Sequence, residues 1–179
     1  MKVGLLFAVS AMLLVTPAVA AGQGAISVQA AVGTHVSDRG NTRAIGIGFL
    51  PNERWEILIS AERFHVPTKV THREGVTTAR RGGTTEFVSA EVRFVPVTFN
   101  RISPYAVVSV GRGTSRPNVN DTFPHPVTNP ATLFFTGGGV RVALARRLSA
   151  FADLRIGFQG ERDGIYGLMP VRGGVAWRF

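Results

Sequence analysis

The sequence predicts an all-β protein, an antiparallel up-and-down β-barrel of eight strands, and two observations indicate it. Eight segments alternate apolar residues with polar or small ones at a period of two, which is typical of strands with one apolar face. The connections between them alternate between short and long, as in barrels that have turns at one end and loops at the other. The length of 179 residues fits one domain.

Turn residues bound each expected strand, and seven of the eight show clear faces. The expected strands are Ala25–Val36, Thr42–Leu50, Trp55–Val66, Thr84–Val95, Ile102–Arg112, Ala131–Leu144, Leu148–Gln159 and Ile165–Phe179. In the fifth, Val108 and Val110 compete with Tyr105 and Val107 for the apolar face, so its faces stay unassigned. The connections after the second, fourth and sixth strands are short, and long polar loops are expected at 67–83 and 113–130.

Aromatic residues indicate which face points outward. Five of them lie on apolar faces beside the short turns or at the last residue: Phe49, Trp55, Phe94, Trp177 and Phe179. Gathered at one level they predict one girdle of a lipid-facing band, with Phe134 and Phe158 as candidates for the second. We therefore expect a transmembrane barrel. The alternative is a soluble, periplasmic lipocalin-like carrier, in which the apolar faces would line the interior.

With the apolar faces outward, the charged residues of the strands point into the lumen. They are Glu56, Glu62, Glu91, Arg93, Arg141, Asp153, Arg155, Arg172 and Arg178. Isolated buried charges are costly, so these residues are expected to pair. Because eight strands enclose room only for side chains, the sequence predicts an ion-pair network that fills the barrel. A gated proton or ion path along this network is the alternative.

The first 20 residues have the layout of a signal peptide. Lys2 precedes the apolar run 3–15, and Ala18-Val19-Ala20 forms a small-residue cleavage site. The run is too short for a retained membrane anchor, which needs about 20 residues. We expect 1–20 to be removed and 21–179 to form the barrel domain. The chain has no cysteine, so neither disulfides nor a lipid-modified cysteine are expected.

In the last ten residues apolar side chains alternate with polar or small ones, and the apolar ones are Val171, Val175, Trp177 and Phe179. In this ending, and in its strand pattern over the whole of 21–179, the chain resembles the small outer-membrane β-barrels of the OmpA/OmpX type. The resemblance implies a monomer in the bacterial outer membrane. It also implies that the barrel-assembly machinery reads the final strand, here Val175, Trp177 and Phe179. The chain lacks the periplasmic peptidoglycan-binding domain of full-length OmpA-type proteins, so no cell-wall tether is expected.

Without Lys2 the chain has 19 basic and 11 acidic residues, and nearly all of the basic ones are arginine. Arg63 has outward parity near the outer end of its strand, with Glu86 placed to pair with it across the hairpin. The long loop that follows carries Lys69, Arg73, Arg80 and Arg81. Since arginine binds phosphate well, these residues are candidates for lipopolysaccharide contact. The alternative is a merely solvated loop, and nucleic acid is not expected as a partner of an exported chain.

Little in the sequence points to catalysis or cofactors. His35 and Ser37 invite comparison with outer-membrane enzymes that modify lipid A, which use His, Ser and an acid, but no acid is spaced to orient His35. His72 and His125 lack partners at metal-ligand spacing. We expect no catalytic residue, metal or cofactor, and a structural or surface-interaction role in contact with outer-membrane lipid and lipopolysaccharide. A lipid A-modifying enzyme is the alternative.

Overall fold

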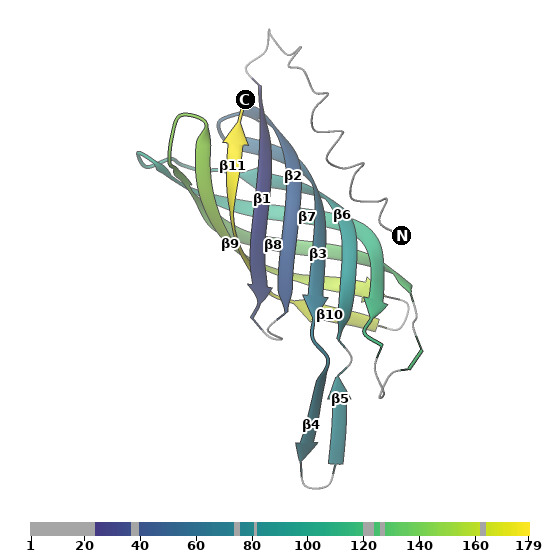
Figure 1. Cartoon of the computed structure of the whole chain (residues 1–179). Coiled ribbons are helices and arrows are strands. Elements are labelled where there is room, and N and C mark those ends of the chain that lie inside the picture. Colours follow the sequence, from purple (N-terminus) through teal and green to yellow (C-terminus); the bar gives the residue numbers. More distant parts are fainter. Residues whose placement is uncertain are drawn as a thin grey trace.

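The computed structural model describes residues 24–36, 40–73, 76–80, 82–119, 124–125, 128–161 and 164–179. Within them the chain forms a closed antiparallel barrel (Figure 1). The wall follows the order β1, β2, β3, β6, β7, β8, β9, and then β11, which returns to β1. The expected signal peptide at 1–20 lies outside the described residues, so its assignment stays a prediction.

The predicted eight-stranded wall is confirmed, with most boundaries displaced by a few residues. The wall strands are β1 (Ala25–His35), β2 (Asn41–Asn52), β3 (Trp55–Val66), β6 (Gly83–Phe94), β7 (Ile102–Pro117), β8 (Asn129–Ala143), β9 (Leu148–Glu161) and β11 (Pro170–Arg178). The predicted eighth strand is divided at Met169, and its first part is β10 (Gly164–Leu168), which pairs with β9. The division occurs at Pro170, which has no backbone N–H to donate to a ladder.

The two predicted long loops contain more strand than expected. β4 (Lys69–Arg73) and β5 (Val76–Arg80) form a separate hairpin that extends beyond the barrel at the end opposite the C-terminus (Figure 1). β7 continues to Pro117, because β6 pairs with it as far as Gly83. The polar composition of these two segments predicted loops, but strands pair through backbone hydrogen bonds, which polar side chains do not prevent.

The connections at 53–54, 95–101 and 144–147 lie at the end of the barrel that holds Phe179, called here the turn end (Figure 1). The opposite end is called the loop end. In the first turn Asn52 Oδ1 accepts hydrogen bonds from the backbone N–H groups of Arg54 and Trp55, at 2.9 and 3.1 Å. Asn100 has a φ of 54°, a left-handed conformation that Asn tolerates.

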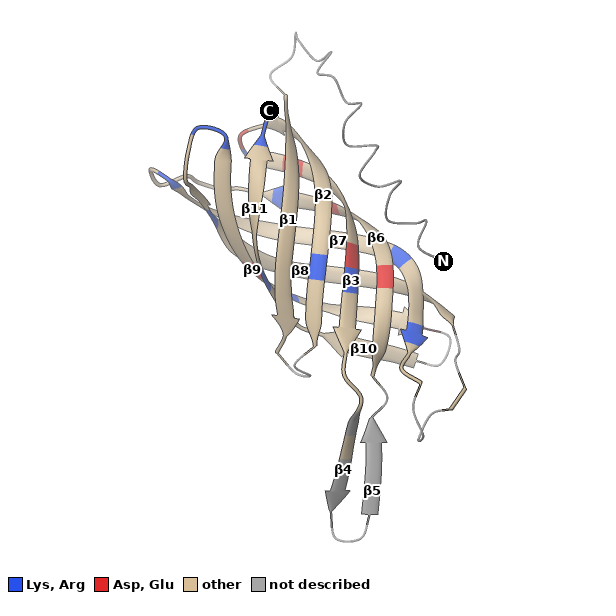
Figure 2. Cartoon of the chain, in the orientation of Figure 1, with Lys and Arg blue, Asp and Glu red and all other residues tan. Residues whose placement is uncertain are grey.

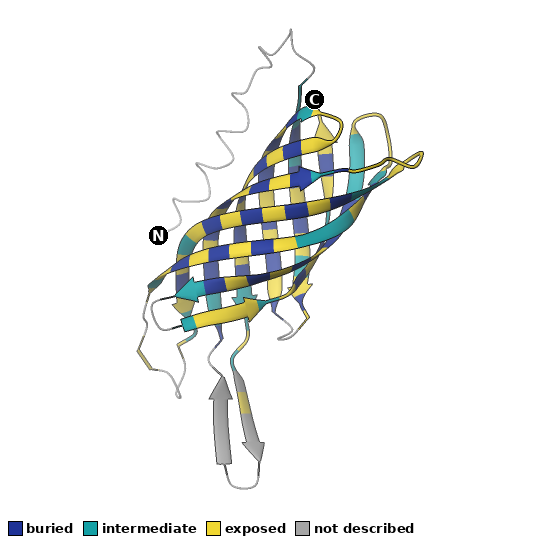
Figure 3. Cartoon of the chain, turned by 180° about the vertical axis from the view of Figure 1, so that it is seen from behind, coloured by how far each residue is buried: buried dark blue, intermediate teal, exposed yellow. Residues whose placement is uncertain are grey.

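Buried and exposed residues alternate along most of the length of the wall strands, as Figure 3 shows. β2 is the clearest case, with the exposed residues Ile45, Ile47 and Phe49 between buried ones. The unassigned fifth strand is now resolved, since Tyr105 and Val107 face inward and Val108 and Val110 face outward. No helix among the described residues is long and apolar enough to cross a membrane.

Candidate functional site

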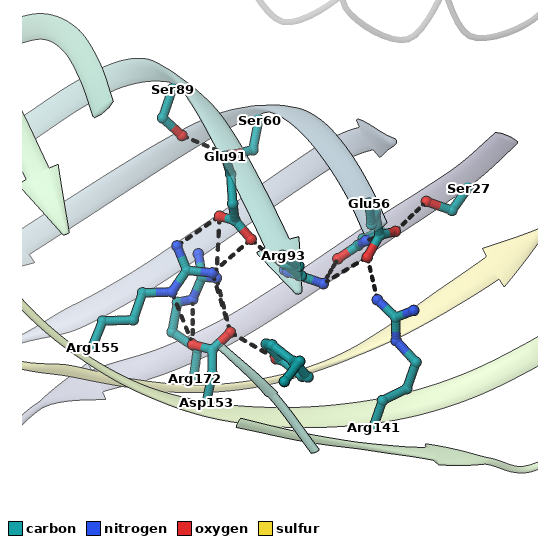
Figure 4. Close-up of polar contacts among 12 residues, drawn as sticks. Ser27, Glu56, Ser60, Ser89, Glu91, Arg93, Arg141, Asp153, Arg155 and Arg172 are labelled. Atoms are coloured by element: carbon teal, nitrogen blue, oxygen red, sulfur yellow. Dashed lines mark hydrogen bonds and ion pairs between the residues drawn. The ribbon is translucent and has the colours of Figure 1, made fainter. Parts of the chain in front are cut away.

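The lumen holds a continuous chain of alternating positive and negative side chains (Figure 4). It contains eight of the nine charged residues expected in the lumen, in the order Arg141, Glu56, Arg93, Glu91, Arg155, Asp153, Arg172 and Glu62. Each neighbour in this order is an ion-pair partner, and every member is buried. Four arginines face four carboxylates, so the formal charges of this luminal chain balance.

At the turn end of this luminal chain of charges, Glu56 on β3 has four polar partners. Arg141 on β8 pairs with its Oε2 atom, and Arg93 Nη1 lies 3.5 Å from the same oxygen. Its Oε1 atom accepts hydrogen bonds from Ser27 Oγ at 2.7 Å and from Gln29 Nε2 at 2.8 Å. Strands β1, β3, β6 and β8 therefore meet at one carboxylate, which remains satisfied although it is 2% exposed.

In the middle of the luminal chain of charges, Glu91 on β6 accepts hydrogen bonds from two arginines, and Arg172 Nη2 lies 3.9 Å from its Oε2 atom. Arg155 on β9 contacts both of its oxygens, with Nη1–Oε2 and Nη2–Oε1 distances of 2.6 and 2.9 Å. Arg93 Nε donates to Oε1 at 2.6 Å. The Arg93 guanidinium also lies over the rings of Tyr105 and Phe151, 5.1 and 5.0 Å from their centroids. Bidentate, charge-assisted hydrogen bonds of this kind fix geometry as well as contributing energy.

The remaining part of the luminal chain of charges is organised around Asp153 on β9. Arg172 on β11 donates to both of its oxygens, from Nε at 3.0 Å and from Nη2 at 3.1 Å. The Tyr105 hydroxyl donates to Oδ2 at 3.0 Å. Arg172 Nη1 then reaches across the lumen to Glu62 Oε2 on β3, at 2.9 Å. The network therefore links facing walls of the barrel.

The prediction that Arg178 also points into the lumen is wrong. Arg178 is exposed at the last residue of β11, where the barrel wall ends. Its backbone N–H donates to the Arg147 carbonyl in the β8–β9 turn at 2.8 Å. Arg178 keeps the inward parity of its strand, but it is the last residue of β11, at the open rim of the wall, where its side chain is exposed to solvent.

Towards the loop end an apolar layer lies beside the charged chain, and the aromatic residues in it were not predicted to face inward. It consists of Phe64, Phe87, Ala131, Leu133 and Phe135, all at most 4% exposed. The Phe64 ring lies 5.0 Å from that of Phe87 and 5.8 Å from that of Phe135. The available signal was parity, because Phe64 is two residues after Glu62 and so shares its face.

Of the two candidates for catalysis, His35 and Ser37, the structure describes only His35. His35 is 1% exposed, and its ring packs edge-on against Phe64 with centroids 4.8 Å apart, on the luminal side of β1. Ser37 lies outside the described residues. Among the described residues no group of three or more potential metal-binding side chains occurs.

On the outside of the barrel, arginines from neighbouring strands form what we call the outer basic row: Arg43, Arg63, Arg112 and Arg116. Arg43 on β2 is the direct cross-strand partner of Arg63 on β3. Arg63 lies opposite Glu86 on β6, with 3.6 Å between Arg63 Nε and Glu86 Oε1. Charged segments on β2, β3, β6 and β7 are visible on this side in Figure 2. Glu86 is the only outward-facing acid on the described wall strands, so the row keeps an excess of positive charge.

The loop candidates for lipopolysaccharide contact lie next to this row in the chain. Lys69 and Arg80 are register partners in the β4–β5 hairpin, and Arg73 at the end of β4 is the register partner of Val76. Arg81 lies outside the described residues.

Aromatic residues mark the turn end of the outer surface, and all of them except the half-buried Phe94 are exposed. Trp55 and Phe94 are cross-strand partners with ring centroids 4.7 Å apart. The residues predicted as an assembly signal, Val175, Trp177 and Phe179, are 49, 44 and 64% exposed on the same surface. Phe134 and Phe158, the candidates for a second girdle, pair with each other nearer the loop end and are exposed as well.

No protein-family model and no curated protein sequence matches the chain. Among solved structures, Neisserial surface protein A (NspA) is similar with a TM-score of 0.65 and 12% identity, over 88% of this chain and 98% of that one. A major outer membrane protein from Thermus thermophilus gives 0.53 and 16%, over 87% and 99%. Ail of Yersinia pestis, in complex with the heparin analogue sucrose octasulfate, gives 0.51 and 13%, over 87% and 97%. The chain therefore has the fold of small outer-membrane barrels, as the resemblance predicted.

Proposed function

We propose that the chain is an integral, monomeric outer-membrane barrel with a non-catalytic surface role, in which the outer basic row binds lipopolysaccharide phosphates. One observation carries the proposal: the apolar residues of the wall point outward while the charged network is enclosed. Ile47, Ile57 and Ile59 are between 41 and 63% exposed, whereas Glu91 and Arg155 are 1% exposed. Such a distribution suits a barrel whose solvent is hydrocarbon and disfavours a soluble lipocalin-like carrier.

The spacing of the aromatic residues supports a membrane-spanning position. Trp177 lies opposite Leu148 on β9, and Phe158 is ten residues further along that strand. Ten residues cover about 34 Å along a strand, or about 26 Å along the membrane normal at a tilt of roughly 40°. This agrees with the apolar band of outer-membrane barrels, which is about 25 Å tall.

The outer basic row fits the boundary of that band on β2, β3, β6 and β7. Arg63 is eight residues from Trp55 on the same strand, which is about 21 Å along the normal by the same geometry. Arginine at this depth can extend its guanidinium to the phosphate level while its stem covers apolar surface. Lipopolysaccharide phosphates suit bidentate arginine contacts. Ail, which shares the fold, was solved with a sulfated sugar.

The location of His35 supports a non-catalytic role. A lipid A-modifying enzyme needs its His accessible to lipid, whereas His35 is buried against Phe64 on the luminal side. We propose that the luminal chain is structural, that it fills the barrel, and that Val175, Trp177 and Phe179 are read during barrel assembly.

Heat-modifiable gel migration tests the membrane assignment. The protein is extracted with detergent and run in SDS with and without boiling, and vesicle flotation is measured in parallel. We expect a folded, faster-migrating band before boiling and flotation with lipid. A protein that stays monodisperse in plain buffer and migrates identically in both lanes would contradict the proposal. Replacing His35 or Ser37 with Ala should leave lipid A unchanged by mass spectrometry; an altered lipid A would instead favour the enzyme.

A further inference from the structure

We propose that arginines at the turn end bind the phosphate groups of anionic phospholipids in the leaflet that the short turns face. We call them the arginine rim: Arg54, Arg101, Arg146, Arg147 and Arg178. The inference rests on the proposed membrane insertion. It adds a second lipid-binding surface, at the opposite end of the barrel from the outer basic row.

Each described short connection at the turn end contributes to the rim. Arg54 lies in the β2–β3 turn, Arg101 in the β6–β7 turn, and Arg146 and Arg147 in the β8–β9 turn. Arg178 ends β11 and is joined to the last of these turns by the hydrogen bond from its backbone N–H to the Arg147 carbonyl. Three of the five arginines are therefore gathered beside β9 and β11. Figure 2 shows basic segments on the loops and strand ends at this end of the barrel.

The charge of the rim is not neutralised by the described part of the chain. All five arginines are exposed, and none forms an ion pair with a described residue. Glu53 is the only acidic residue on the described short turns. Each of the four arginines of the luminal chain, by contrast, has a carboxylate partner. An anionic ligand from outside the chain would supply what the rim lacks.

The neighbouring tryptophans place the rim at the depth of lipid phosphates. Trp55 directly follows Arg54, and Trp177 directly precedes Arg178. Aromatic girdles lie at the headgroup level, so arginines one residue beyond them meet the phosphate layer. Arginine recognises phosphate through two parallel hydrogen bonds, and clustered basic residues attract anionic lipid.

Intrinsic fluorescence can report on this end alone, because the chain has two tryptophans and both, Trp55 and Trp177, lie at the turn end. The protein is inserted into phosphatidylcholine vesicles that contain a minor fraction of either brominated phosphatidylglycerol or brominated phosphatidylcholine. We expect stronger quenching by brominated phosphatidylglycerol than by brominated phosphatidylcholine, corresponding to an enrichment of phosphatidylglycerol around the rim of about two- to fivefold. The enrichment should fall at about 0.5 M NaCl, because the rim is exposed to solvent.

Paired variants test whether the rim causes this enrichment. Arg146→Gln with Arg147→Gln should bring the two quenching values close together, whereas Arg43→Gln with Arg112→Gln, on the outer basic row, should leave the enrichment unchanged. Heat-modifiable migration confirms that each variant is folded.

Three outcomes would overturn the inference while the proposed function stands. They are equal quenching by both lipids in the inserted wild-type protein, enrichment that survives the turn variant, and enrichment abolished by inorganic phosphate at matched ionic strength. Competition by inorganic phosphate would mean that the rim binds free phosphate rather than lipid. A wild-type protein that does not insert at all would overturn the proposed function together with this inference.

Discussion

Arg155 on β9 binds both carboxylate oxygens of Glu91 on β6, at 2.6 and 2.9 Å, across the interior of the barrel. The two strands are not neighbours in the wall, since β7 and β8 lie between them. Both side chains are at most 1% exposed, so bulk solvent does not reach the pair to replace a lost partner. It therefore acts as a cross-brace whose contribution depends on its being complete.

The first prediction follows from that dependence. Glu91→Gln removes the carboxylate that Arg155 and Arg93 share and leaves them only Asp153 and Glu56. Breaking buried ion pairs in this way costs about 3–5 kcal/mol in the free energy of unfolding. Urea unfolding in detergent, followed by gel migration, measures the loss. Glu86→Gln on the same strand is the matched control. Its pair with Arg63 is exposed, so it should cost at most about 1 kcal/mol. Equal effects of the two variants would contradict the structural role of the luminal chain.

The second prediction concerns the apolar layer at the loop end of the network. Phe135→Ala should leave a cavity beside Phe64 and Phe87 and cost about 3–5 kcal/mol. Phe134→Ala, one residue earlier and 46% exposed, is the control. In a membrane, fluid lipid chains refill the space that its ring leaves, so the cavity contribution is absent and less than half the loss is expected. Unfolding curves of both variants in the same detergent decide between these outcomes.

The luminal position of these charged residues could be predicted from the sequence, because alternate residues of a strand point to opposite faces of the wall. Parity alone places Glu56, Glu91 and Arg155 on the inner face, with no knowledge of which strands meet across the lumen. It could equally have placed Phe64 inside, since that residue shares the face of Glu62. The partners could not be predicted in the same way. Arg172 reaches Glu62 because of the tilt and register of the closed wall, and these depend on all of the strands together.

Two further differences arise where a strand meets an end. Arg178 has inward parity but is exposed, because a period of two does not reveal where the wall ceases to enclose a lumen. The break at Met169 follows from Pro170, whose missing donor marks a local irregularity without fixing how far β10 and β11 separate.

A third prediction addresses transport. The charged chain and the apolar layer occupy the interior, and an eight-stranded barrel has room only for side chains. Purified protein in planar lipid bilayers should therefore produce no stepwise conductance at any applied voltage. Single-channel recordings that show reproducible steps, abolished by Glu91→Gln, would instead favour an ion path along the luminal chain.

The fourth prediction tests which face meets lipid, and the absence of cysteine makes it direct. Val88→Cys and Ser89→Cys introduce single thiols on adjacent positions of β6, the first 57% exposed and the second 2% exposed. An environment-sensitive fluorophore on residue 88 should be quenched by brominated lipid. The thiol at residue 89 should react slowly while the protein is folded and readily after boiling in SDS. Reactivity with the opposite pattern would require the wall to be turned inside out.

The fifth prediction concerns the outer basic row, whose positive charge is interrupted by one acid. Arg43→Gln combined with Arg63→Gln and Arg112→Gln should weaken binding of purified lipopolysaccharide by at least about tenfold, because several charge-assisted phosphate contacts are lost together. Glu86→Gln should strengthen binding slightly, since it removes the one outward-facing acid of the described wall strands while leaving the arginines in place. Binding can be followed by titrating lipopolysaccharide into detergent-solubilised protein at low and high salt. The wild-type affinity should fall as salt rises, because the row is exposed to solvent. If the triple variant bound as tightly as the wild type, the phosphates would have to be recognised elsewhere, and the row would serve only to mark the edge of the apolar band.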